Sequence, residues 1–370
     1  MKILLLYMLF QFIISVITYR VNILEYFFRL KYLWMSFLVL PYLLLIKRGG
    51  IGYLAKLILP VAIVSNILYI FSAITGVAFL PDIEIVKQDL PGGLKVWRVF
   101  GGTFYGEVFM LGIIFYWNEY KFKLIYIPFF IFFALPHILA FGRSAWVFFT
   151  FAIVFIIVWR SYRKHDFKTL IKQIVMIGVT ITAFVYFFNQ FIPQSEQLTE
   201  AIEARIQQGQ SDLKYGEGTY GTRMANIKVL LDLWSANPIL GIGMNPFWVI
   251  NAVTVEENIY AWGLADIRWT GMLVVYGIVG FLIAIIFQLY YIILSFRLLK
   301  KIQLININYF FVLIFLIGLL RDLVLNYSYV LLTVSLHALG PIVSFYIANI
   351  IYFYEKQVNN NLKKNNPKAI

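Results

Sequence analysis

Residues 269–296 have the sequence WTGMLVVYGIVGFLIAIIFQLYYIILSF and contain no Asp, Glu, Lys or Arg. An α-helix needs about 20 apolar residues to cross the ~30 Å hydrocarbon layer of a bilayer. This stretch is long enough, so it predicts a membrane-spanning helix. The same kind of run recurs along the chain and decides the class of the fold.

The composition of the whole chain agrees with that prediction. Of 370 residues, 61% are hydrophobic and 13% are charged, whereas soluble domains carry about 25% charged residues. A soluble fold with so little charge could not cover its surface. The composition therefore excludes a soluble enzyme, a disordered protein and, since there is no cysteine, a disulfide scaffold.

Ten apolar windows predict an all-α integral membrane protein with about ten transmembrane helices. The windows lie near 3–19, 32–46, 57–80, 99–117, 124–141, 145–159, 171–192, 269–296, 304–320 and 328–354. They form one polytopic domain over residues 1–358, and the polar, basic residues 359–370 are expected to be a disordered cytoplasmic tail.

The distribution of charge predicts the direction of insertion. With the N-terminus inside, the inner segments hold 18 basic and 3 acidic residues, and the net charge of the whole chain is +13. Cytoplasmic loops carry an excess of Lys and Arg, so both termini are expected in the cytoplasm of a bacterial inner (plasma) membrane. The same rule places the excess charge at a membrane and not on nucleic acid.

One outer loop, at about 193–268, is much longer than the others, and such long loops are usually functional. Leu198, Ile202 and Ile206 are spaced for an amphipathic helix on the bilayer surface, which the glycines at 209 and 216–218 should end. A second helix is expected over 222–236, followed by a turn at Pro238–Gly243.

A set of charged residues is expected at the outer ends of the spans. Five of its eight members are arginines, whose planar fork of donors suits diphosphate and carboxylate groups. The simpler interpretation is that each arginine reaches to the interface or pairs with a nearby acid. The set comprises Arg98, Glu107, Arg143, Arg223, Asp266, Arg268, Arg321 and Asp322.

Other kinds of chemistry lack support in the sequence. His137, His165 and His337 have no second ligand at metal spacing and there is no cysteine, so neither a metal nor another cofactor is expected. No Walker loop, dinucleotide fingerprint or Gly-x-Ser-x-Gly motif occurs.

Four short segments, taken in order, resemble the O-antigen polymerase and ligase superfamily of bacterial membrane glycosyltransferases. Together they span residues 98–280, roughly half the chain, and their order and spacing are more specific than any one of them. The segments are Arg98-Val-Phe-Gly-Gly-Thr-Phe104, Phe141-Gly-Arg-Ser-Ala145, Arg223…Trp234…Pro238-Ile-Leu-Gly-Ile-Gly243, and Asp266-Ile267 followed by Gly277-Ile-Val-Gly280.

One position departs from the ligase pattern. In the ligase branch, the position that corresponds to Asp266 resembles a His, and this His is taken as the catalytic base. The resemblance therefore favours the polymerase branch. It implies a polyprenyl-diphosphate-linked oligosaccharide as donor, a second lipid-linked oligosaccharide as acceptor, and transfer at the outer face of the membrane.

On this resemblance, Arg143 and Arg223 bind the diphosphate and Asp266 acts as base or orients the acceptor hydroxyl. Arg98 and Arg268 assist, and Glu107, Arg321 and Asp322 are further substrate-binding candidates. Asp266 could instead pair with Arg268 or cap the following helix. Two other functions stay open: a ligase that passes the glycan to another acceptor, and a flippase for lipid-linked oligosaccharides. A chain-length regulator and a flippase of the same pathway could be partners.

Overall fold

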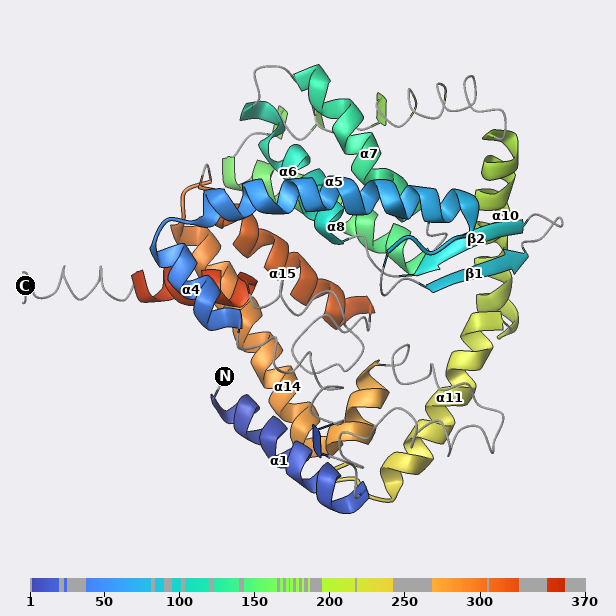
Figure 1. Ribbon diagram of the computed structural model, residues 1–370, viewed down its shortest axis with the longest axis vertical. Coiled ribbons are helices and arrows are strands. Elements are labelled where there is room, and N and C mark those ends of the chain that lie inside the picture. The colour runs from blue at the N-terminus through green and yellow to red at the C-terminus, as the bar shows by residue number, and fades with distance from the viewer. Residues whose placement is uncertain are drawn as a thin grey trace, which may run out of the picture. The chain divides into compact units, whose positions relative to one another are not determined.

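The computed structural model describes thirteen segments and some separate residues of the chain (Figure 1). The chain consists of two compact units. One is Ile51–Tyr215, and the other combines Met1–Gly50 with Gly216–Ile370. The described segments are 2–19, 23–24, 38–80, 84–89, 95–100, 104–119, 123–139, 143–164, 195–216, 218–241, 268–304, 306–325 and 345–356, with separate residues between 167 and 186.

The unit Ile51–Tyr215 consists of apolar helices and one β-hairpin. Helices α5, α6, α7 and α8 pack against one another, β2 packs on α5, and α10 contacts α8. The elements are α5 (Ile51–Thr75), β1 (Glu84–Asp89), β2 (Lys95–Phe100), α6 (Phe104–Tyr116), the 3-10 turns η2 (Trp117–Glu119) and η3 (Lys123–Ile125), α7 (Tyr126–Leu139), α8 (Arg143–Lys164) and α10 (Ser195–Tyr215).

Polar side chains join the apolar helices of this unit. Asn66 is buried on α5 and donates from Nδ2 to the carbonyl of Phe132 on α7, at 2.6 Å. Arg160 is buried on α8 and pairs with Glu119 at 2.8 Å, while Lys164 reaches the same carboxylate at 3.0 Å. Because lipid is as apolar as the helix surfaces, such bonds help decide which helices pair.

The second unit is built around the long helix α14. Helix α1 and helix α11 both contact α14, and α15 lies along it. Its elements are α1 (Lys2–Tyr19), α4 (Val39–Lys47), α11 (Gly218–Ser235), α14 (Arg268–Lys301), α15 (Ile307–Leu325) and a helix over residues 345–356.

Helix α14 is broken at Gly277, which has φ +63° and ψ −174°. A positive φ is open to glycine and strained for other residues. The turn after α11 crosses the break at close range, and Gly241 in that turn also has a positive φ. The bend between the two parts of α14 is visible beside α1 (Figure 1).

The crossing turn replaces the helical hydrogen bonds that the break removes. The amide of Ile278 donates to the carbonyl of Pro238 at 2.9 Å, and the amide of Val279 donates to the carbonyl of Ile239 at 3.3 Å. A Cβ on Gly277 would overlap the carbonyl of Ile239, and a Cβ on Gly241 would overlap the backbone of Val274 to Gly277. The two glycines therefore permit a contact of backbone with backbone.

The apolar helices agree with a membrane protein. Among the described residues, three helical segments are long and apolar enough to cross a bilayer: Ile58–Thr75, Trp146–Lys164 and Leu273–Lys301. Three apolar helices are shorter, at Gly106–Tyr116, Tyr126–Leu139 and Ile307–Leu320. On α5, apolar side chains such as Val61, Val64 and Phe71 are more than half exposed, as expected for a surface that contacts lipid. The count of ten spans stays a prediction.

Several predicted boundaries differ from the structure. The window 99–117 begins in strand β2, so its helix starts at Phe104, and the hairpin was not predicted. Helix α8 is longer than the window 145–159, and α10 continues through Gly209 to Tyr215. The windows 304–320 and 328–354 predict that Arg321 and Asp322 lie between two spans; instead, helix α15 extends to Leu325, so both residues lie inside it.

Other predictions are confirmed in part or concern residues that the structure does not describe. The two helices of the long loop are present as α10 and α11, the latter starting at Gly218. Ile206 is exposed, so its predicted contact with the bilayer surface stays open. The predicted tail 359–370 and most of the window 171–192 lie outside the described residues.

We expect Gly277→Ala to destabilise the protein by about 3 kcal/mol or more, because a Cβ would overlap the carbonyl of Ile239 at a strained φ. Thermal unfolding of the purified protein in detergent measures the effect. Gly318→Ala is the matched control, since no atom lies within 4 Å of its added Cβ in α15, and it should keep or raise the melting temperature. Equal melting temperatures for wild type and Gly277→Ala would contradict the tight crossing.

Candidate functional site

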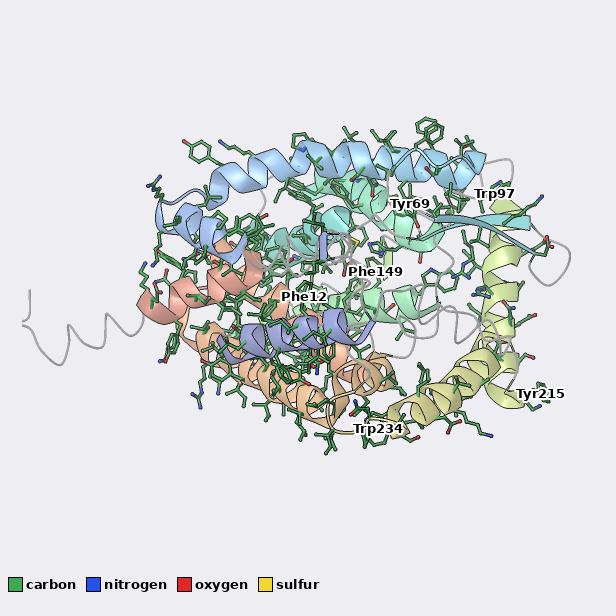
Figure 2. The ribbon with its side chains drawn as sticks, turned by 60° about the horizontal axis from the view of Figure 1, so that its bottom comes forward. Phe12, Tyr69, Trp97, Phe149, Tyr215 and Trp234 are labelled. Atoms are coloured by element: carbon green, nitrogen blue, oxygen red, sulfur yellow. The ribbon has the colours of Figure 1, made fainter. Side chains whose placement is uncertain are left out.

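Arg98 lies on strand β2, opposite Val86 of β1 in an antiparallel pair. The strand is fixed to α5 by the buried hydroxyl of Tyr69, which donates to the carbonyl of Val99 at 2.8 Å. The half-buried Arg98 is close enough to act electrostatically on that hydroxyl. Figure 2 shows Tyr69 and Trp97 near the end of α5 and the hairpin. Arg98 is thus held by a strand before α6 and not by a helix.

Glu107 lies in the first turn of α6 and is buried, with 8% of its surface exposed. The predicted window 99–117 would place Glu107 more than two turns from the start of a span, which is wrong because the helix begins at Phe104. A carboxylate in a first turn is favoured by the helix dipole. Its neighbour Gly106 lies against Asn66 and Phe133, which brings α5, α6 and α7 close together.

Arg143 is the first residue of α8, and only three residues separate it from the end of α7 at Leu139. The predicted short junction between the two spans is therefore confirmed. The corner is closed by the indole of Trp146, whose Nε1 donates to the carbonyl of His137 at 2.9 Å. The imidazole of His137 stacks on Phe149, with ring centroids 5.3 Å apart, which gives this histidine a packing role.

Arg223 and Arg268 lie on two helices of the other unit that run side by side. Leu230 of α11 packs on Val274 of α14, and Ile227, Leu233 and Trp234 surround this contact. Further along both helices, the turn Pro238–Gly241 meets the break at Gly277. The contacts advance in the same direction along both chains, so α11 and the first part of α14 are roughly parallel.

This arrangement brings two predicted site positions to one end of the unit. Residue 223 precedes Leu230 by about two turns, and residue 268 precedes Val274 by nearly two turns. Position 268 begins α14, whose amino-terminal end carries partial positive charge, and position 223 lies in the second turn of α11, which begins at Gly218. The two arginine positions thus precede the Leu230–Val274 contact on both helices.

Five of the remaining predicted site residues are divided between the two units. Arg321 and Asp322 lie in the last two turns of α15, in the same unit as Arg223 and Arg268. Arg98, Glu107 and Arg143 belong to the unit Ile51–Tyr215. Asp266 lies outside the described residues, two positions before α14 begins.

The part of the chain that the structure describes contains no group of three or more His, Asp or Glu side chains that could hold a metal ion.

Sequence reasoning missed the polar residues that support these positions. Tyr69, Asn66 and Gln11 are partly or fully buried in apolar helices and bond to backbone carbonyls. A usable signal was present, because an amide side chain inside an apolar helix is costly unless it has a partner. The partner could not be inferred, since each one is a carbonyl that is distant in the sequence.

The described residues thus form a mostly helical membrane protein with an arginine-bearing helix pair next to a glycine crossing. Residues 127–285, somewhat less than half of the chain, match the family model described as O-antigen ligase. This region of the chain is therefore similar to that family. No curated protein and no solved structure matches the chain.

The matched region contains three of the four segments on which the resemblance was based, those that carry Arg143, Arg223 and Asp266. It also contains both glycines of the crossing. Arg98, Glu107, Arg321 and Asp322 lie outside it, so their assignment rests on the sequence alone. The family match does not separate the polymerase branch from the ligase branch.

We expect Tyr69→Phe to lower the free energy of unfolding by about 1–2 kcal/mol, because the buried carbonyl of Val99 loses its donor. Because this bond fixes the strand that carries Arg98, glycan transfer should also fall. Denaturation in detergent and a transfer assay measure the two effects. Tyr53→Phe, on the exposed start of the same helix, should change stability by less than about 0.5 kcal/mol. Equal loss in both variants would refute the specific role of the bond.

Proposed function

We propose that this protein is a polysaccharide polymerase that joins polyprenyl-diphosphate-linked oligosaccharide repeat units at the outer face of the bacterial inner membrane. The observation that carries the proposal is that Arg223 and Arg268 both precede the Leu230–Val274 contact on two roughly parallel helices, with Asp266 two residues before Arg268. The family match over the same residues supports it.

The donor of this reaction already carries its leaving group. As the bond between the anomeric carbon and the diphosphate oxygen breaks, negative charge grows on the diphosphate. Arginines and helix amino-terminal ends that are fixed in advance stabilise that charge strongly where water is excluded. Arg223 and Arg268 serve this purpose in the proposal, with Arg143 as a further ligand of the diphosphate. With these cations, the transfer requires no metal ion.

Asp266 is the proposed base. The acceptor hydroxyl attacks the anomeric carbon, the bond to the diphosphate breaks, and the proton of the hydroxyl passes to the carboxylate. A carboxylate with an ordinary pKa of ~3.9 is a weak base, but the attacking hydroxyl becomes acidic late in a displacement of oxocarbenium character. Direct displacement inverts the anomeric configuration.

The other candidates have supporting roles in the proposal. Arg98 and Arg321 assist in binding the charged part of the substrate, and Glu107 and Asp322 bind hydroxyl groups of the glycan. Both termini are cytoplasmic in this scheme, so that the long segment from about 193 to 268 is external.

A ligase is the second candidate, because the matching family model is described as O-antigen ligase. The two activities differ in the acceptor. A polymerase transfers to another lipid-linked repeat unit, whereas a ligase transfers to a different molecule such as a lipid A core or a protein. Asp266-Ile267, in place of the His-containing pair of ligases, favours the polymerase.

We expect purified protein in detergent to convert a single lipid-diphosphate oligosaccharide, with EDTA and without nucleotide sugar, into a ladder of multiples of the repeat unit on a gel. Arg223→Ala should lower kcat by about 10²-fold or more because the growing negative charge loses a cation. Lys228→Ala is the control, since Lys228 is an exposed cation on the same helix.

The outcomes of that assay separate the candidates. Transfer that occurs only after a different acceptor is added would favour the ligase. No transfer by the wild-type protein with several repeat units and acceptors would reject both enzymes and favour a flippase.

We expect Asp266→Asn to lower kcat by about 10²-fold or more, since an amide cannot accept the proton. The variant should insert and melt as the wild type does. NMR of the product should show an anomeric configuration opposite to that of the donor. An unchanged rate in Asp266→Asn would exclude the role as base, and a retained anomer would exclude direct displacement.

A further inference from the structure

Two side chains of the N-terminal helix bond to the backbone on both sides of the glycine crossing. The hydroxyl of Tyr7 donates to the carbonyl of Tyr276, the last residue before the break in α14, at 2.6 Å. Gln11 Nε2 donates to the carbonyl of Leu240, in the turn that crosses the break, at 2.9 Å. Helix α1 therefore connects the two chain segments that meet at Gly241 and Gly277.

The two side chains also bond to each other and are closely packed. Gln11 Nε2 donates to the hydroxyl oxygen of Tyr7 at 2.7 Å, so one network reaches from Leu240 to Tyr276. Gln11 has no exposed surface, although it lies in an otherwise apolar helix. The ring of Tyr7 lies so close to Gly280 that a Cβ there would overlap it. An amide buried in such a helix is costly unless it is hydrogen-bonded, and here it is.

The segment on the far side of this network is short. The first part of α14 extends from Arg268 to Tyr276, about two and a half turns, and a helix of this length is marginal without packing. Its contacts among the described residues come from α11 at Val274, from the turn at Gly241 and from Tyr7 at Tyr276. The orientation of this segment determines where residue 268 lies. It therefore also determines where α14 begins, two residues after Asp266.

We propose that Tyr7 and Gln11 are positioning residues for glycosyl transfer, because they hold the segment Arg268–Tyr276 in the orientation that the reaction requires. The inference rests on the proposed function, but the physical link that it describes can be tested without any substrate. Residues 7 and 11 lie outside the region that matches the family model, so this adds a part of the chain that the family match does not cover.

The first test is hydrogen–deuterium exchange of the full-length protein in detergent, followed by mass spectrometry. Tyr7→Phe removes one hydroxyl and keeps the ring, and Gln11→Ala removes both donors of the amide. Each variant should speed the exchange of the amides of Ile278 and Val279 by about tenfold, since these amides donate across the crossing. Exchange in α6, in the other unit, should be unchanged.

Ile17→Ala is the matched control for these variants. Ile17 is on the same helix and 71% exposed, so its truncation removes apolar surface without touching the network. It should leave exchange at 278–279 as in the wild type. Unchanged exchange at 278–279 in both Tyr7→Phe and Gln11→Ala would overturn the proposal, as would faster exchange throughout the protein, because the residues would then only support the fold.

The second test uses the polymer ladder assay. Tyr7→Phe and Gln11→Ala should each lower kcat by about tenfold and change KM for the lipid-linked donor by less than about twofold, because a misoriented segment weakens the transition state more than the bound ground state. The double variant should lose no more than the worse single variant, since both act through one network. Faster local exchange with unchanged kcat would overturn the positioning role. No transfer by the wild type would reject the proposed function instead, and the exchange experiment would still decide the physical link.

Discussion

The close contact between the backbones at Gly241 and Gly277 is the constraint on which the unit around α14 depends. Breaking a helix inside an apolar layer leaves amides without partners, and each such amide costs several kcal/mol in lipid. Here the carbonyls of Pro238 and Ile239 accept from the amides of Ile278 and Val279, which is possible only because neither glycine has a side chain. The break, the turn and the end of α11 therefore form one structure, and none of the three would keep its shape alone. Because of the break, the first part of α14 points in a different direction from the second part. It can therefore lie alongside α11, toward the candidate site.

Polar groups inside apolar helices have the same effect in both units. Apolar surfaces favour lipid and protein about equally, so hydrogen bonds and small residues decide which helices pair. Asn66 joins α5 to α7, the buried Arg160 with Glu119 joins α8 to the turn η2 that follows α6, and Gln288 on α14 bonds to the carbonyl of Leu319 on α15. Arg160 also lies over the ring of Phe115, with 5.5 Å between the guanidinium carbon and the ring centroid, which adds a cation–π contact to the ion pair. Each of these contacts gives a buried polar side chain a partner.

The sequence predicted the elements that depend on periodicity and missed those that depend on partners. Apolar length located α5, α7, α8, α14 and α15, and the spacing of turn residues located α11 and its end at Asn237-Pro238. The hairpin was missed because the largely apolar end of β2, Val96 to Phe100, was taken as the start of a span. The break at Gly277 was missed because Gly-Ile-Val-Gly fits an apolar helix as well as it fits a turn, and only the approach of Gly241 distinguishes the two. Of the eight predicted site residues, helix periodicity could bring 223 and 268 together only after Leu230 and Val274 were known to be in contact.

In the proposed reaction, arginine suits positions 223 and 268 better than lysine or a metal ion. A diphosphate leaving group gains charge on several oxygens while it moves away from the anomeric carbon, so the cation must follow a spread and shifting charge. A planar guanidinium offers several donors to neighbouring oxygens and stays ionised at any pH at which the fold exists. Two guanidinium groups on separate helices can bind the diphosphate at both phosphates, provided that the helices hold a fixed spacing. That spacing is set by the Leu230–Val274 contact and by the glycine crossing below it. Residues without functional groups thus determine whether the charged ones can act together.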